Sequence, residues 1–149
     1  MKSRSSRQVL NIAHPRVAGI VEVIAMSRLH LARVFLVVTA LSLFVASLIH
    51  FGYLVEGYDD RGAATPEAVI GAVMVVGLVL SWVRPAWGRQ ALVGALAFGL
   101  AGSTLGLVLV FVGVGPQTTP DIIYHVSLVV ALVIGLYLAI TSEPTTSSI

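Results

Sequence analysis

Long apolar stretches separated by short polar ones dominate the chain. A helix needs about 20 mainly apolar residues to cross roughly 30 Å of hydrocarbon. Four stretches meet or approach this length, at residues 31–55, 66–83, 91–114 and 120–140. The segments between them are short and rich in Gly, Pro or charge, so consecutive helices should lie antiparallel. The pattern predicts an all-α polytopic membrane protein, in which four transmembrane helices form an up-down-up-down bundle.

The composition agrees with this pattern. Of 149 residues, 57% are hydrophobic and 11% are charged, and the mean hydropathy is +0.96. A soluble domain carries about 25% charged residues. The composition therefore excludes a water-soluble globule, a disordered chain and a nucleic-acid-binding protein. The chain has no cysteine, which excludes disulfides and thiolate metal sites.

Basic residues gather on one side of the predicted membrane, where they are typical of the cytoplasmic face. Eight of the nine Lys and Arg residues lie on this side, and only Arg61 lies on the other side, with five of the seven acidic residues. The eight are Lys2, Arg4, Arg7, Arg16, Arg28, Arg33, Arg84 and Arg89. This asymmetry predicts that both termini are cytoplasmic.

The same reading divides the chain into three segments. Residues 1–28 form a basic cytoplasmic segment, residues 29–141 the four-helix domain, and residues 142–149 a cytoplasmic tail. Within the first segment, residues 15–26 combine spaced apolar side chains with Pro15 near the start, which suits a short interfacial helix. A frayed tail is the alternative, and Met26 would also suit a start of translation.

Small residues recur every four positions along the predicted spans, a pattern that lets membrane helices approach closely. The rows predict a tight contact between the third and fourth helices. They comprise Ala91, Ala95, Gly99 and Ser103, with Gly102 and Gly106, on the third span, Ala131, Gly135 and Ala139 on the fourth, and Gly71 and Gly77 on the second.

Two histidines within the spans are the main functional candidates, because ionisable groups are costly inside a membrane. His50 lies five residues before the expected end of the first helix, and His125 lies five residues after the start of the fourth. At 1.5 Å per residue, both should lie roughly 7–8 Å inside the outer boundary.

Other polar residues should lie at the same depth. Tyr53 continues a polar stripe from His50, Tyr124 adjoins His125, and Glu67 and Asp121 follow prolines that suit a first helical turn. We expect these six side chains to line one pocket that opens outward. Each also has a plainer explanation. The two acids suit first helical turns, the tyrosines suit an aromatic belt, and a His50–Asp121 or His125–Glu67 bridge would be structural.

Three ligand chemistries fit such a pocket. His50 and His125 could bind the iron of a b-type haem axially. The same histidines with Glu67 or Asp121 could bind a divalent metal ion. Alternatively, the imidazoles and carboxylates, with Tyr53 and Tyr124, could bind a quinone-like head group or relay protons. The residue pattern does not distinguish these three ligand chemistries.

One loop resembles a motif of small four-helix bacterial membrane proteins. It runs from Val112 to Asp121 (VGVGPQTTPD) and is followed by Tyr124-His125. The Thr65-Pro66-Glu67-Ala68 start expected for the second helix and the His50-Phe51-Gly52 segment are similar as well. The resemblance implies a multi-pass protein of the bacterial inner membrane and implies no activity.

We therefore expect a small accessory or ligand-binding membrane protein with an outward pocket. The alternative is a purely structural subunit of a respiratory or photosynthetic type of complex, or a homo-oligomer, that packs through the Gly/Ala rows. An oxidoreductase is the third hypothesis. The phosphate-binding, nucleophile-elbow and zinc-protease motifs, which would indicate other enzyme classes, are absent from the sequence.

Overall fold

A computed structural model describes residues 4–115 and 117–142. Lys2, Pro116 of the loop motif, and residues 143–149 of the expected cytoplasmic tail lie outside the described residues.

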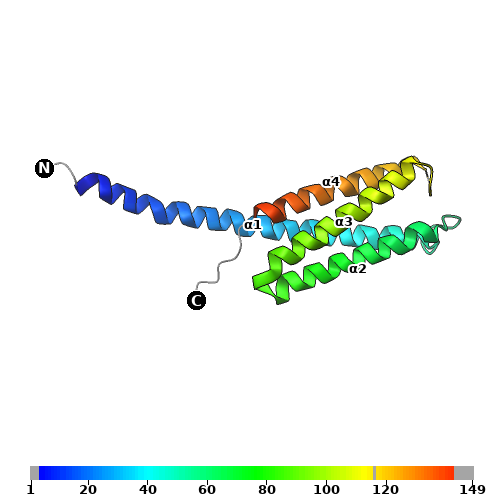
Figure 1. Cartoon of the computed structure of the whole chain (residues 1–149), viewed down its shortest axis with the longest axis horizontal. Coiled ribbons are helices and arrows are strands. Elements are labelled where there is room, and N and C mark those ends of the chain that lie inside the picture. The colour runs from blue at the N-terminus through cyan, green and yellow to red at the C-terminus, as the bar shows by residue number, and fades with distance from the viewer. Residues whose placement is uncertain (1–3, 116, 143–149) are drawn as a thin grey trace.

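Four helices make up the structure. They are α1 (Arg4–His50), α2 (Arg61–Val83), α3 (Gly88–Phe111) and α4 (Thr119–Thr141), with a short 3-10 helix, η1 (Pro85–Trp87), between α2 and α3. Each helix packs lengthwise against its neighbours in the chain, and α4 returns to α1 to close the bundle (Figure 1). All four are long and apolar enough to cross a membrane. The predicted four-helix fold is confirmed, and the chain is a multi-pass membrane protein.

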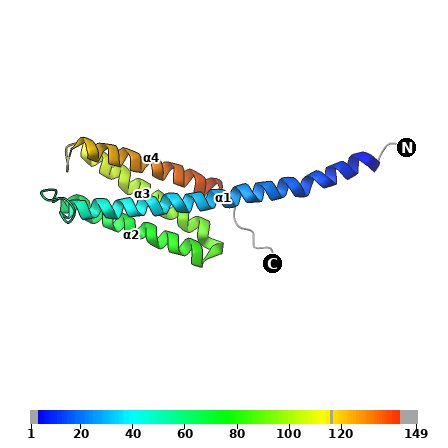
Figure 2. The ribbon, with the colours of Figure 1, turned by 180° about the vertical axis from the view of Figure 1, so that it is seen from behind.

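Helix α1 is much longer than a membrane span. Its 47 residues extend about 70 Å at 1.5 Å per residue, more than twice the roughly 30 Å of hydrocarbon. Figures 1 and 2 show its N-terminal half running well beyond the bundle. Residues 15–26, for which a short interfacial helix was one expectation, are helical as part of α1, and their place at the membrane surface stays a prediction.

Helices α1 and α3 end earlier than their hydropathy suggested, and both end in the same way. Gly52 and Gly113 have positive φ angles of 76° and 89°, which non-glycine residues rarely adopt. After α1, the N–H groups of Gly52 and Tyr53 donate to the carbonyls of Ile49 and Leu48, at 2.8 and 3.0 Å. The same pair of bonds follows α3 at Gly113. This is the Schellman arrangement, and it makes His50 the last residue of α1.

Helices α2 and α4 begin at side-chain caps. Asp60 accepts hydrogen bonds from the N–H groups of Gly62 and Ala63, so α2 starts five residues before the expected Pro66. Glu67 is therefore not a first-turn acid. Thr118 caps α4 by accepting from the N–H of Asp121, and Asp121 does lie in the first turn, as predicted.

The small-residue rows are used inside the bundle. The closest approach joins α2 and α3, where a Cβ on Gly77 would lie 2.3 Å from the Cβ of Ala95. A Cβ on Gly135 of α4 would meet Phe35 of α1 and Leu96 of α3, at 3.0 and 3.2 Å. The expected contact of the third and fourth helices is present, and Gly77 and Ala95 bring α2 and α3 closely together as well.

Two arginines close the bundle at the end away from the α1–α2 and α3–α4 loops. Arg33 of α1 donates to the carbonyl and hydroxyl of Ser81 in the last turn of α2, at 2.7 and 3.2 Å. Arg89 of α3 donates to the carbonyls of Ile140 and Ala139 at the end of α4, at 2.6 and 3.2 Å. The last carbonyls of a helix have no partner within it and carry partial negative charge, so each guanidinium caps a neighbouring helix.

Candidate functional site

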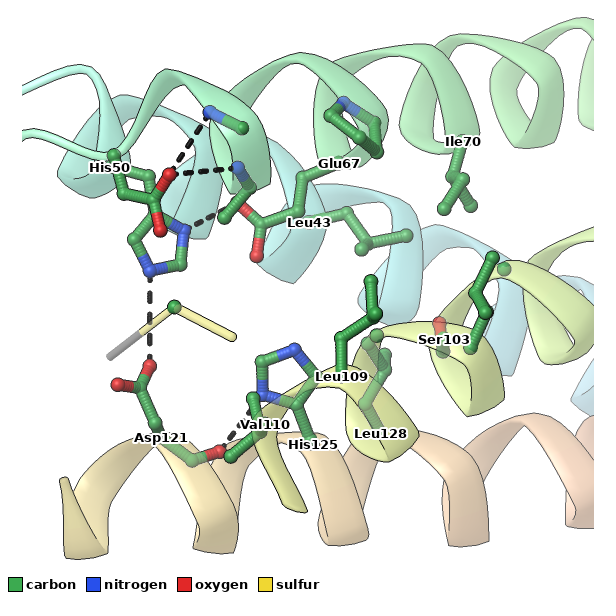
Figure 3. A pocket seen from close by; sticks show the side chains of 18 of the residues that line it. Leu43, His50, Glu67, Ile70, Ser103, Leu109, Val110, Asp121, His125 and Leu128 are labelled. Atoms are coloured by element: carbon green, nitrogen blue, oxygen red, sulfur yellow. Dashed lines mark hydrogen bonds and ion pairs between the residues drawn. The ribbon is translucent and has the colours of Figure 1, made fainter. Parts of the chain in front are cut away.

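A cavity of about 320 Å³ lies inside the bundle at its loop end (Figure 3). All four helices contribute to its walls. Most of the lining is apolar, and apart from Ser103 the polar side chains gather toward the loops. The apolar part includes Leu43, Ile70, Leu105, Leu109, Val110 and Leu128, and the polar part includes His50, Glu67, Ser103, Asp121 and His125.

His50 is held between two carboxylates from two other helices. Its side chain is 3% exposed, and its Nδ1 lies 2.7 Å from Oε2 of Glu67 on α2. Its Nε2 faces Oδ1 of Asp121 on α4 at 3.7 Å, which is too long for a hydrogen bond. The backbone N–H of Asp60 donates to the His50 carbonyl at 2.8 Å, which ties the end of α1 to the start of α2.

Asp121 has further partners on the loop side. Its Oδ2 accepts from the hydroxyls of Tyr58, at 2.5 Å, and Thr118, at 3.1 Å. The Tyr58 ring also stacks on the His50 ring, with 5.5 Å between the ring centroids. Burial and the hydrogen bond to Asp121 raise the pKa of the Tyr58 hydroxyl above its usual value.

His125 uses one ring nitrogen in a hydrogen bond within α4 and turns the other toward Gly106 at the cavity wall. Its Nδ1 lies 2.9 Å from the backbone carbonyl of Asp121. A carbonyl oxygen only accepts hydrogen bonds, so this nitrogen carries a hydrogen, and Nε2 of the neutral ring is an acceptor. The ring lies against Gly106 of α3, where a Cβ would be 3.4 Å from Nε2. In Figure 3 the ring projects from α4 into the pocket.

Four of the six predicted site residues line this cavity: His50, Glu67, Asp121 and His125. Two do not. Tyr53 lies in the loop after α1 with 77% of its surface exposed, because the chain turns at Gly52 and carries it off the helical stripe. Tyr124 lines a neighbouring groove between α1 and α4. Whether any of the six binds a ligand stays a prediction.

The sequence analysis missed Tyr58 and Ser103 as site residues. Tyr58 had no helical periodicity to place it, and it lies in a loop whose path depends on contacts with α4. Ser103 had a signal, as the only hydroxyl in the small-residue row of α3, but that row indicated helix packing and not a pocket.

The haem and metal hypotheses gain no support from this geometry. Within residues 4–115 and 117–142, no group of three or more His, Asp or Glu side chains is arranged to hold a metal ion. Nδ1 of His50 is bonded to Glu67, so only Nε2 could bind iron, and this nitrogen faces Oδ1 of Asp121 at 3.7 Å. Both hypotheses stay predictions.

Comparison with known proteins adds no relative. No family model, no curated protein and no solved structure matches the chain. The resemblance of the loop motif to small four-helix bacterial membrane proteins therefore stays a prediction, and the function has to be inferred from the chemistry of the cavity.

Proposed function

We propose that this membrane protein binds a small amphipathic molecule whose hydroxylated, quinol-like head group occupies the loop-end cavity. Ligand sites are typically mostly apolar hollows of about 300–1,000 Å³ with a few convergent polar groups. The cavity has this character at the lower end of the range, about 320 Å³. The proposal concerns binding and assigns no reaction.

The observation that carries the proposal is a set of three polar atoms in the cavity wall, two of which are buried and unpaired within the described part of the chain. Oε1 of Glu67 and Oγ of Ser103 have no hydrogen-bond partner among the described residues, and Nε2 of His125 is an acceptor. A buried polar atom left unpaired costs about 1–3 kcal/mol. Two of the three atoms only accept hydrogen bonds, so a complementary ligand has to donate them. A quinol has two hydroxyl donors, whereas the oxidised quinone has none.

We infer that this cavity opens on the extracytoplasmic side of a bacterial inner membrane. The loop end carries Glu56, Asp59 and Asp60, whereas Arg33, Arg84 and Arg89 lie toward the other end. The excess of basic residues at that other end favours a cytoplasmic location for it.

The alternative of a purely structural subunit relied on free Gly/Ala rows. Gly71, Gly77, Gly99 and Gly135 meet side chains of neighbouring helices instead, and Ala95 and Ala139 are buried in the core. These rows stabilise the bundle itself, so they favour no outside partner.

Calorimetry with trimethylhydroquinone and protein in lipid nanodiscs tests the proposal. We expect binding to wild type, and Glu67→Ala should weaken it by about tenfold or more, because one hydrogen bond to a charged group contributes about 1.5–3 kcal/mol. His125→Phe should weaken it by about two- to tenfold, because a hydrogen bond between neutral groups contributes about 0.5–1.5 kcal/mol. Glu56→Ala, in an exposed loop at the same end, is the matched control and should bind as wild type does.

Three results would contradict the proposal. The first is equal affinity for the oxidised trimethylquinone, because the quinone has no hydroxyl donors. The second is unchanged binding by both cavity variants. The third is a haem absorption band or stoichiometric metal in the purified protein that is lost in His50→Ala or His125→Ala, which would favour the haem or metal hypothesis.

A further inference from the structure

A second hollow lies beside the cavity, between α1 and α4. This groove has a volume of about 650 Å³. Ser42 and Ala46 of α1 contribute small side chains to it, and Val45, Ile49 and Val55 contribute apolar ones. Both flanking helices are long and apolar enough to cross the bilayer, and Val45 is 50% exposed. The groove therefore faces the hydrocarbon of the membrane.

The groove and the cavity have two wall residues in common, His50 and Asp121. Each of these side chains lines both hollows, so the pair forms the partition between them. The buried Nε2 of His50 has no hydrogen-bond partner among the described residues and lies within this partition.

The contact across the partition is weaker than the contacts on either side of it. Nε2 of His50 and Oδ1 of Asp121 are 3.7 Å apart, beyond hydrogen-bonding distance. On one side, His50 is hydrogen-bonded to Glu67 at 2.7 Å. On the other side, Asp121 accepts from Tyr58 and Thr118. The pair can therefore separate without breaking these hydrogen bonds, provided that Tyr58, which stacks on His50 and is hydrogen-bonded to Asp121, moves off the His50 ring.

We propose that the groove is the ligand's entrance from the bilayer, and that it holds the ligand's apolar tail while the head group passes between His50 and Asp121 into the cavity. This inference rests on the proposed function and narrows it to a lipophilic, membrane-dissolved quinol-like molecule. The volumes support it, because a 320 Å³ cavity suits a head group and the adjoining 650 Å³ groove has room for a tail.

The absence of native cysteine permits a test in the folded protein. Ser42→Cys places a thiol in the groove, and alkylation with N-cyclohexylmaleimide in nanodiscs then fills the groove after folding. We expect alkylation to slow the binding of radiolabelled decyl-hydroquinone by at least about tenfold, the effect of 1.36 kcal/mol on a barrier. The rate is compared in the same Ser42→Cys protein before and after alkylation, so the substitution itself is present in both measurements.

Leu41→Cys is the matched control, because Leu41 is 60% exposed, adjoins Ser42 in the chain and is not part of the groove lining. Its alkylation should leave the rate unchanged. Ser42→Leu fills the same space without a chemical step and should slow binding as well. If Ser42→Cys does not fold, the binding rate of Ser42→Leu tests whether a filled groove slows ligand entry.

The outcomes separate the two proposals. If wild type binds both trimethylhydroquinone and the decyl compound, and a filled groove leaves the decyl rate unchanged, the entrance is wrong and the cavity proposal stands. If wild type binds neither compound, the proposed function fails, and the entrance fails with it.

Discussion

The two ends of the bundle use polar side chains in opposite ways. At one end, Arg33 and Arg89 donate to the last carbonyls of α2 and α4, and each cation satisfies groups that helix geometry leaves unpaired. At the other end, His50 lies between Glu67 and Asp121, and buried atoms facing the cavity keep unused hydrogen-bonding capacity. The buried polar groups of the first end are therefore paired across the helices, whereas those of the second end include atoms without a hydrogen-bond partner among the described residues.

We call the end with Arg33 and Arg89 the arginine end. The comparison predicts that the arginine end contributes to the stability of the bundle and the loop end to ligand binding. The largest expected effect is that of Arg33→Met, which removes two hydrogen bonds from Ser81. Hydrogen bonds to charged groups contribute about 1.5–3 kcal/mol each, so we expect unfolding in detergent to become easier by about 3 kcal/mol. Denaturant titration followed by circular dichroism measures this.

The matched control for that change is Arg61→Met at the loop end. Arg61 is 82% exposed, and its nearest acid, Asp59, is 3.9 Å away, so its loss should change stability by less than about 1 kcal/mol. Equal destabilisation by the two variants would contradict the division between the ends.

A pair of glycines gives an intermediate effect. A Cβ on Gly88 would lie 2.8 Å from the carbonyl oxygen of Ser81, so Gly88→Ala should disturb the arginine end and cost about 1–3 kcal/mol. A Cβ on Gly106 would lie 3.4 Å from His125, an ordinary contact. Gly106→Ala should therefore leave thermal unfolding unchanged and weaken trimethylhydroquinone binding. The opposite result is weaker trimethylhydroquinone binding by Gly88→Ala and unchanged binding by Gly106→Ala. It would contradict the assignment of stability to one end and binding to the other.

The smallest expected effect is the titration of Tyr58. Its raised pKa means that the folded protein holds the phenolic proton more tightly than the unfolded chain does. The resulting stability is complete below the ordinary tyrosine value of about 10 and is lost as the pH rises through the folded value. Absorbance of tyrosinate against pH should show a late-titrating tyrosine that disappears in Tyr58→Phe. An unchanged curve would mean that the pKa of the Tyr58 hydroxyl is not raised in the folded protein.

The helix ends show what the hydropathy pattern predicts and what it misses. Hydropathy placed the four spans, but it set the end of α1 at Val55, because the apolar residues continue past the turn at Gly52. It also set the start of α2 at Pro66, because a proline suits a first turn, whereas the Asp60 side chain caps the helix earlier. Both errors concern hydrogen bonds of single residues, which apolar periodicity does not report.

The amino-acid sequence was enough to establish four membrane helices, their antiparallel order and the separation of basic from acidic ends, because hydropathy and charge are properties of each segment alone. It also identified four of the side chains that line the cavity. Their partners depended on packing. The bonds of His50 to Glu67 and of Tyr58 to Asp121, the wall that His50 and Asp121 make between groove and cavity, and the exclusion of Tyr53 arise from how segments distant in the chain meet. Such distances depend on the turns and crossing of whole helices, and no single segment encodes them.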